Sequence, residues 1–173
     1  SSFFNLQTTG TTLQIGKWTH VAASRIGNNV IIYINGVQVA TGSFTGAAIS
    51  SLTTPLEIGT SSTMNAKFNG SIDEVRIWNV GRSSNEIANS YLNELTGSET
   101  GLVAYYNFNQ GTVNGTNSLI SNLTDRTSNA INGVITNFAL TGSSSNFVAG
   151  FMPEITGASS LQKTSTTNYT NNL

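Results

Sequence analysis

The sequence predicts an all-β domain whose surface is polar but largely uncharged. The main evidence is residues 17–40, where two runs of apolar and β-branched residues flank Gly27–Asn29 and the second run turns back at Asn35-Gly36. Asn-Gly between such runs favours a type I′ hairpin turn, because that turn needs a positive φ at both central positions. Charged residues make up 9% of the 173 residues, whereas hydrophobic residues make up 38% and recur in strand-like runs. This composition can form a core and is not typical of a disordered chain.

Strands are predicted in order along the first half of the chain, and turn signals separate them. Residues 30–34 are apolar at every position, as expected of a strand in the middle of a layered structure. Pro55 opens a later strand, at a first position where proline is tolerated. Asn69-Gly70 forms a second Asn-Gly turn ahead of the last of these strands. The predicted strands cover residues 3–6, 13–15, 18–26, 30–34, 37–41, 55–59 and 72–78.

One short amphipathic helix is predicted over residues 83–96. It begins with a capping box, in which the Ser83 hydroxyl accepts a hydrogen bond from a backbone N–H and the Glu86 carboxylate reaches back to the cap. Gly97 occupies the position expected of a C′ residue. A single apolar face is expected, because four large apolar residues recur at helical spacing. They are Ile87, Tyr91, Leu92 and Leu95.

The second half of the chain continues the β pattern and then changes composition. From Pro153 onward, large apolar residues become few. We therefore predict a domain over residues 1–150 and, over residues 151–173, a linker or the start of a following module. The elements expected before that boundary are strands over 102–108 and 147–151 and, between them, a polar loop over 109–129 and a hairpin over 130–137.

Composition excludes several classes of function. The net charge is −1 and no basic patch is present, which argues against nucleic-acid binding. No apolar run approaches the about 20 residues that a membrane-spanning helix needs. Cysteine is absent, so neither disulfides nor thiolate metal sites can form. His20 is the single histidine, which excludes a histidine-based zinc site, and no G-x-S-x-G elbow indicates a serine hydrolase.

The order of several short motifs resembles a known family. They run W-T-H-V-A, I-Y-I-N-G-V, P-L-E-I-G, F-N-G-S-I-D-E-V-R-I-W-N and, after the capped helix, G-L-V-A-Y-Y-N-F-N-Q-G. In order and spacing this series is similar to the laminin-G-like, concanavalin-A-like jelly-roll domains of large bacterial secreted and cell-surface proteins, over residues 10–150. The resemblance implies an antiparallel jelly-roll sandwich of two sheets packed around one apolar core.

One departure from that family concerns the start of the chain. Such domains begin with several strands upstream of the tryptophan strand, and this chain holds almost none of them. A jelly roll without those strands would expose sheet edges and part of its core. We therefore expect residues 1–150 to be a fragment of a longer protein whose N-terminal strands are missing, or to be completed by another module or chain.

Catalysis by paired carboxylates is the main enzymatic alternative, because some jelly rolls are glucanases. A glycosidase needs two carboxyl groups about 5–9 Å apart on either side of one bond. The only close acidic pair within a predicted strand is Asp73-Glu74, and adjacent strand residues point to opposite faces. The sequence therefore predicts that this chain is not an enzyme.

Two aspartates are candidate ligands for a structural Ca²⁺ ion, which related domains often carry. Asp73 lies near the start of a strand, where a buried carboxylate needs a partner. The alternatives are an ion pair with Arg76 or Arg82, or hydrogen bonds from loop amides. Asp125 is the second candidate, in a polar loop, and its alternative is an Asx-type turn. No other cofactor is expected.

The resemblance implies a recognition or adhesion module that binds a carbohydrate or another surface ligand, secreted or exposed at a cell surface, within a larger multidomain protein. Two alternatives stay open, a structural spacer or assembly module and an ancillary domain of a carbohydrate-active enzyme. Aromatic side chains could stack on sugar rings or could belong to the core. The candidates are Trp18, Trp78, Tyr33, Tyr105 and Tyr106.

Overall fold

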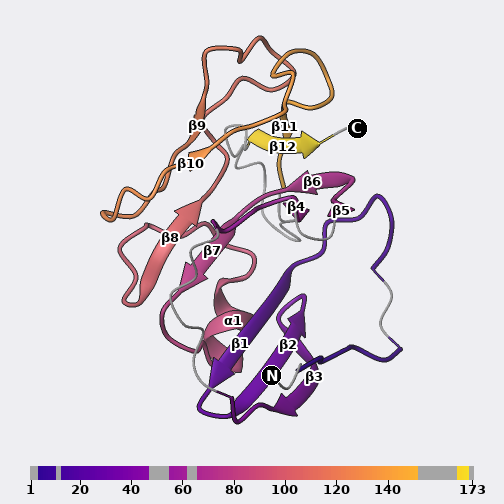
Figure 1. Cartoon of the computed structure of the whole chain (residues 1–173), viewed down its shortest axis with the longest axis vertical. Helices are drawn as coiled ribbons and strands as arrows, with labels where there is room; N and C mark the ends of the chain where they lie inside the picture. The colour runs from indigo at the N-terminus through magenta and orange to yellow at the C-terminus, as the bar shows by residue number, and fades with distance from the viewer. Residues whose placement is uncertain (1–3, 11–12, 47–54, 62–65, 152–166, 172–173) are drawn as a thin grey trace, which may run out of the picture. The chain divides into compact units, whose positions relative to one another are not determined.

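The structure, a computed structural model, describes residues 4–10, 13–46, 55–61, 66–151 and 167–171 (Figure 1). The chain forms two compact units. Unit 1 comprises residues 1–54 and 78–95, and unit 2 comprises residues 55–77 and 96–173. No helix in the described part of the chain has the length and apolar character needed to span a bilayer.

Strands dominate both units, and the described residues hold a single short α-helix, so the predicted all-β class is confirmed. Every pairing whose register is defined is antiparallel. Unit 1 contains β1 (Val21–Ile26), β2 (Asn29–Ile34), β3 (Val37–Ser43) and α1 (Ser84–Ser90). Unit 2 contains β4 (Thr60–Ser61), β5 (Ala66–Lys67), β6 (Gly70–Ile72), β8 (Leu102–Tyr106), β9 (Asn122–Leu123), β10 (Gly133–Val134), β11 (Phe147–Ala149) and β12 (Thr167–Asn171), and β7 (Val75–Trp78) ends at its boundary.

The sheet of unit 1 is the predicted β-meander, in the order β1-β2-β3. Its second turn has the expected conformation, because Asn35 has a φ of 49° and Gly36 a φ of 78°. Two hydrogen bonds connect this turn to His20, the residue before β1. The Asn35 N–H donates to the His20 carbonyl (2.9 Å), and the Asn35 Oδ1 accepts from the His20 N–H (3.0 Å). A register shift at Ile32/Tyr33 adds a bulge between β2 and β3.

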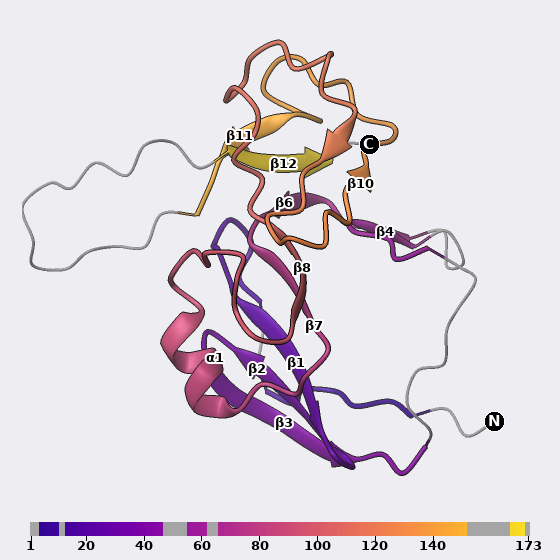
Figure 2. The ribbon, with the colours of Figure 1, turned by 90° about the vertical axis from the view of Figure 1, so that its left-hand side faces the viewer.

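One face of this sheet is covered by residues 78–95 of the same unit. Ser24 and Tyr33 point to that face and are buried, and the Ser24 hydroxyl donates to the Arg82 carbonyl at 2.7 Å. Figure 2 shows α1 lying beside β3. At the turn that joins β2 to β3, the Tyr91 ring approaches Gly36 so closely that a Cβ there would lie 2.9 Å from ring carbons.

Gly36→Ala is therefore expected to destabilise unit 1 more than Gly27→Ala. Both glycines have a left-handed φ, which costs an L-residue about 1–2 kcal/mol. Only at Gly36 would the new methyl also meet Tyr91, and overpacking adds about 1–3 kcal/mol, whereas Gly27 has open space. Denaturant unfolding followed by tryptophan fluorescence measures the difference, because Trp18 and Trp78 both belong to unit 1. Equal losses of stability would contradict the Tyr91 contact.

The helix begins where the sequence predicts and ends earlier than predicted. The capping box of Ser83 and Glu86 is present, which confirms the start. The C-cap is Tyr91, so α1 covers 84–90 and not 83–96. Beyond Tyr91 the predicted apolar face is interrupted, because Leu92 is 42% exposed. Gly97 is not the C′ residue, and its φ of 89° instead lets it lie against the Arg126 carbonyl.

Unit 2 has its core around β8. Antiparallel pairing builds the sheet β11-β12-β6, and β8 pairs with β7. Two buried asparagines hold the long loops of this unit, since the Asn117 side chain donates to the Asn146 side chain at 2.7 Å. The core cluster consists of Ala104, Tyr106, Phe108 and Leu123, against which Ile58, Ile72, Val75, Ile77, Ile135 and Phe138 pack.

Several predicted strand limits are wrong. The described residues of 3–6, 13–15 and 55–59 form no strand, and the strand predicted over 72–78 is two strands separated by Asp73 and Glu74. Glu74 interrupts the strand because its φ is 58°, outside the β region. Part of the predicted linker forms β12, which pairs with β11 and β6. The division into residues 1–150 and 151–173, with missing N-terminal strands, stays a prediction.

Candidate functional site

An open hollow lies on unit 2, at the ribbon formed by β4 and β5. Its volume is about 430 Å³, within the size range of ligand sites. Among the described residues, no aspartate, glutamate or histidine lines it, and Lys67 is its one titratable side chain. Its lining residues are Gly59, Thr60, Ser61, Ala66, Lys67, Phe68 and Ile72.

Strand alternation explains how the hollow is built. Thr60 pairs with Lys67 and Ser61 pairs with Ala66, and the Phe68 N–H extends the ribbon by donating to the Gly59 carbonyl at 2.9 Å. Side chains alternate between the two faces of a strand, so small residues form one face of this ribbon and the Phe68 ring projects from the same face. The other face carries Thr60 and Lys67. The small residues are Gly59, Ser61 and Ala66.

Phe68 and Ile72 are the large apolar side chains of the hollow. The Phe68 ring is 51% exposed and lies over Gly70, where a Cβ would come within 2.7 Å of ring atom Cε1. The Ile72 Cδ1 methyl lies 3.4 Å from where a Cβ of Gly59 would be. An exposed aromatic ring positioned in this way can stack on an apolar surface, while hydroxyl and peptide groups beside it can form hydrogen bonds.

The five aromatic residues singled out from the sequence take different positions. Tyr33, Tyr105 and Tyr106 are at most 5% exposed and belong to the interior, the position that is more common for aromatics in a sandwich. Trp78 is half-buried, with the Arg82 guanidinium 4.2 Å from its ring centroid, and Trp18 of unit 1 is 40% exposed. The sequence analysis does not single out Phe68, because the Asn-Gly pair that follows it predicts a turn. That prediction is wrong, since Gly70 begins β6 and neither Asn69 nor Gly70 has a positive φ. The available signal was an aromatic residue directly before an Asn-Gly pair in a polar loop.

Asp125 is buried and organises a loop of unit 2. Its Oδ1 accepts from the backbone N–H groups of Tyr105 (3.0 Å) and Thr127 (2.9 Å), and its Oδ2 accepts from the Thr127 hydroxyl (2.8 Å) and the Ile131 N–H (2.9 Å). Burial by itself raises the pKa of the Asp125 carboxyl, but the hydrogen bonds from Thr127, Tyr105 and Ile131 outweigh it and lower the pKa below 3.8. The contact with Thr127, two residues on, is that of an Asx-turn.

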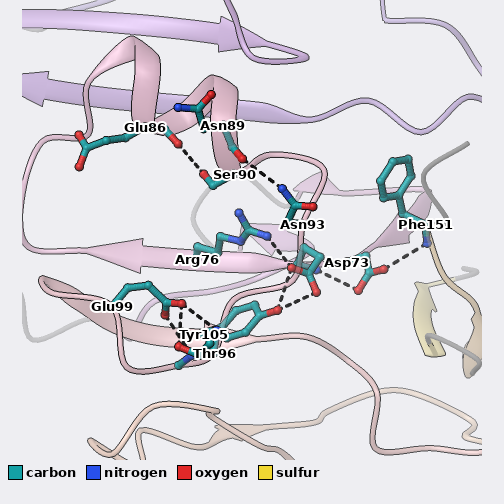
Figure 3. A network of polar contacts seen from close by, with 12 residues as sticks. Asp73, Arg76, Glu86, Asn89, Ser90, Asn93, Thr96, Glu99, Tyr105 and Phe151 are labelled. Atoms are coloured by element: carbon teal, nitrogen blue, oxygen red, sulfur yellow. Dashed lines mark hydrogen bonds and ion pairs between the residues drawn. The ribbon is translucent and has the colours of Figure 1, made fainter. Parts of the chain in front are cut away.

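Asp73 and Glu74 direct their carboxylates to different partners, and Figure 3 shows Asp73 with its partner Phe151. The Asp73 oxygens accept from the backbone N–H groups of Glu74 (2.9 Å) and Phe151 (3.2 Å), so loop amides hold this side chain. Glu74 forms an ion pair with Arg76 (2.7 Å) and accepts the Tyr105 hydroxyl hydrogen bond (2.8 Å). The two carboxylates therefore serve separate structural contacts, although the strand alternation assumed from the sequence is broken between them.

The structure does not gather Asp73 or Asp125 into an acidic cluster. Among the described residues, no group of three or more His, Cys, Asp or Glu side chains is arranged to hold a metal ion. Of the predicted ion-pair partners of Asp73, Arg76 binds Glu74 and Arg82 binds Glu86 at 2.7 Å. Calcium binding at either aspartate stays a prediction, which calorimetric titration of the protein with Ca²⁺ would test.

Comparisons with known proteins find similarity in sequence and in structure. The model of the concanavalin A-like lectin/glucanases superfamily matches residues 2–88, half of the chain. Pappalysin-1 of Mus musculus is 38% identical over 76 residues, which are 42% of this chain and 5% of that protein. A candidate carbohydrate-binding protein from Bacteroides ovatus superposes with a TM-score of 0.60 at 25% identity, over 75% of this chain and 37% of that one. An S-layer domain-containing protein from Clostridium thermocellum gives a TM-score of 0.40 at 31% identity, over 47% of this chain and 42% of that one.

Proposed function

Because the chain belongs to the concanavalin A-like lectin/glucanase superfamily, we propose that it is a carbohydrate-binding module without catalytic activity of its own. The structural likeness to the candidate carbohydrate-binding protein of Bacteroides ovatus supports the ligand class. Fold alone does not assign a ligand, so the proposal depends on a specific site. That site is the hollow on unit 2.

The observation that carries the proposal is the exposed Phe68 ring, held over Gly70 beside a floor of small residues. A sugar ring has an apolar face that can stack on Phe68, and its hydroxyls can exchange hydrogen bonds with Ser61 and with peptide groups of the ribbon. The low charge of the chain fits a neutral, hydroxyl-rich ligand, which is recognised by hydrogen bonds and stacking. Specificity then comes from the few polar groups at the edge of the hollow.

The lining of the hollow supports binding without hydrolysis. Glycoside hydrolysis requires two carboxyl groups that flank one bond, and no described residue that lines the hollow carries a carboxyl group. Asp73 and Glu74 hold backbone, arginine and tyrosine partners instead. Reducing-sugar release from glucans, measured with the purified chain, would overturn this part of the proposal.

We place the module outside the cell, as part of a larger surface or secreted protein. This chain spans 5% of pappalysin-1 and 37% of the Bacteroides ovatus protein, so the matched regions of both occur within longer chains. A shallow site of this kind binds weakly by itself, and linkage to further modules raises the total affinity without new contacts. Detecting the parent protein in a surface or culture-supernatant fraction would test the placement.

A glycan array first identifies a glycan that the wild-type chain binds. Phe68→Ala is expected to weaken the affinity for that glycan by about 10-fold, since an aromatic pair contributes about 0.5–1.5 kcal/mol beyond area burial. Phe68→Leu keeps apolar bulk over Gly70 but lacks the aromatic face, so it should lose nearly as much. Titration of this glycan into each variant measures the effect.

Two exposed residues outside the hollow provide matched controls. Val134→Ala removes an exposed apolar side chain from unit 2 and should leave binding unchanged. Trp18→Ala tests the exposed aromatic of unit 1. Binding that survives Phe68→Ala but is lost on Trp18→Ala would move the site to unit 1. Binding of no glycan by the wild-type chain would instead favour the structural spacer.

A further inference from the structure

The chain contains four Asn-Gly pairs, a dipeptide that can modify itself without an enzyme. The backbone nitrogen of the glycine attacks the side-chain carbonyl carbon of the asparagine, and glycine allows this approach because it has no Cβ. Asparagine is for this reason among the thermolabile residues. Folding decides which pairs can react, because the attack needs a movable carboxamide and an available nitrogen. The pairs are Asn35-Gly36, Asn69-Gly70, Asn114-Gly115 and Asn132-Gly133.

Two of the four carboxamides are held by hydrogen bonds. The Asn35 Oδ1 accepts from the His20 N–H at 3.0 Å, and Gly36 beside it is buried. The Asn132 Oδ1 accepts from the Asp125 N–H at 2.9 Å, within the loop that the Asp125 carboxylate organises. Rotating either carboxamide toward the following nitrogen would break that bond, so both pairs should react slowly in the folded chain.

At the Asn114-Gly115 pair, the nucleophile itself is engaged. The Gly115 N–H donates to the Thr112 carbonyl at 3.0 Å, in a turn where a Cβ at Gly115 would lie 2.8 Å from the Thr112 methyl. The Asn114 N–H also donates to the Phe147 carbonyl at 2.8 Å. This turn must open before the Gly115 nitrogen can attack. The rate of deamidation at Asn114 is therefore reduced in proportion to the small fraction of molecules in which the turn is open.

Asn69 is exposed, and its side chain forms no hydrogen bond with any described residue. Asn114 shares both properties, so these two pairs differ in the glycine nitrogen and not in the carboxamide. Asn69 follows the exposed Phe68 of the hollow and precedes Gly70, the first residue of β6. Gly70 pairs with Asn171, the last residue of β12, so its nitrogen lies at the end of the ladder and in no turn like that of Gly115. Of the four pairs, Asn69-Gly70 thus combines an exposed, unbonded carboxamide with a nitrogen at a strand end.

We propose that Asn69 is a site of spontaneous deamidation, selected by the fold from the four Asn-Gly pairs. The Gly70 nitrogen forms a bond to the Asn69 Cγ, the bond from Cγ to the amide nitrogen breaks, and the Gly70 amide proton leaves with that nitrogen as ammonia. Water then opens the cyclic imide at either carbonyl, which yields aspartate or isoaspartate at position 69. No oxidant or reductant is required.

The product changes the surface beside the hollow. A neutral carboxamide next to Phe68 becomes a carboxylate, which adds one negative charge to a chain whose net charge is −1. Isoaspartate also lengthens the backbone by one methylene between Phe68 and β6, so the contact of the ring with Gly70 should change. The modification is independent of whether the hollow binds a sugar.

Incubating the folded full chain at mildly alkaline pH, followed by tryptic digestion and mass spectrometry, tests the proposal. Cleavage after Lys67 and Arg76 releases peptide 68–76, whose only asparagine is Asn69. Conversion at Asn69 should exceed conversion at each of the other three sites by about 10-fold or more, because protected sites react only after local opening. Asn69→Ser should abolish the mass gain in this peptide.

The same four sites in denaturant provide the control. Unfolding removes the contacts of Asn35, Asn114 and Asn132, so all four pairs should then convert at similar rates. A folded chain in which another Asn-Gly pair converts as fast as Asn69 would overturn the proposal. An Asn69 that converts in denaturant and stays intact in the folded chain would overturn it as well.

Discussion

Asp125→Ala is expected to lower the free energy of unfolding of unit 2 by about 3–5 kcal/mol, because each buried donor left without an acceptor costs about 1–3 kcal/mol. The substitution removes the acceptor of three backbone N–H groups and one hydroxyl, contributed by Tyr105, Thr127 and Ile131. Urea unfolding followed by circular dichroism measures the global loss. Amide hydrogen exchange at the three backbone N–H groups measures the local one.

Two substitutions serve as comparisons for Asp125→Ala. Asp125→Asn keeps the shape but replaces one acceptor oxygen with a donor, so it should remain strongly destabilising. Ser128→Ala removes an exposed hydroxyl from the same loop and should change stability by less than about 0.5 kcal/mol. If Asp125→Ala costs no more than the Ser128 control, the carboxylate does not organise the loop.

The lowered pKa of Asp125 also predicts how stability depends on pH. Its pKa in the folded chain lies below the ordinary value of 3.8, so folding favours the ionised form. A depressed folded-state pKa contributes stability at pH values above the unfolded pKa, and this contribution is lost as the pH falls through the folded pKa. The wild-type chain should therefore lose stability below about pH 4, and Asp125→Asn should show a shallower loss over the same range.

Glu74→Ala is the second change with a large expected effect. The Arg76 side chain is 9% exposed and would lose the carboxylate that it binds at 2.7 Å, while the fully buried Tyr105 would lose the acceptor of its hydroxyl. Removing one partner of a buried ion pair costs about 3–5 kcal/mol, because the remaining charge stays buried. Urea unfolding followed by circular dichroism measures the loss.

The unusual backbone of Glu74 supplies a matched control. Its φ of 58° costs an L-residue about 1–2 kcal/mol, which glycine avoids. Glu74→Gly removes the same carboxylate as Glu74→Ala and should be less destabilising by about 0.5–1 kcal/mol, because the greater freedom of glycine in the unfolded chain offsets part of the relieved strain. A glycine variant that is less stable than the alanine variant would contradict the strain at this position.

Tyr105→Phe isolates the hydroxyl from the ion pair. It keeps the buried ring and leaves Glu74 with Arg76, so the expected loss is about 1.5–3 kcal/mol, the range for a hydrogen bond to a charged group. A loss equal to that of Glu74→Ala would mean that the Arg76 ion pair contributes little. An unchanged stability would mean that the hydroxyl bond is not formed in solution.

Elements encoded by neighbouring residues were predictable from the sequence. The β-meander, the Asn35-Gly36 turn and the capping box of Ser83 and Glu86 are present where the residues indicate them. Each depends on a short-range property: side-chain alternation, tolerance of positive φ, or a contact three residues away. The all-β class was predictable for the same reason, because it rests on many short strand patterns, each encoded by neighbouring residues.

The site and the ends of several elements were decided only by the tertiary structure. The hydrogen bond between Asp125 and Tyr105 spans 20 residues of sequence, and the one between Glu74 and Tyr105 spans 31. The hydrogen bond between Asp73 and Phe151 spans 78. No local pattern encodes such contacts, because they depend on how distant segments pack.

The same reason applies to Phe68, whose exposure depends on the ribbon beside it and on Gly70 beneath its ring. It also applies to the helix, whose C-cap is Tyr91 and whose apolar face does not continue through the exposed Leu92. The sequence by itself determined the kind of structure and the Asn35-Gly36 turn, whereas Gly70 and Gly133 lie in strands and not in the Asn-Gly turns that were predicted there. Packing between segments far apart in the chain determined which carboxylates are held by structural contacts and which aromatic rings remain exposed.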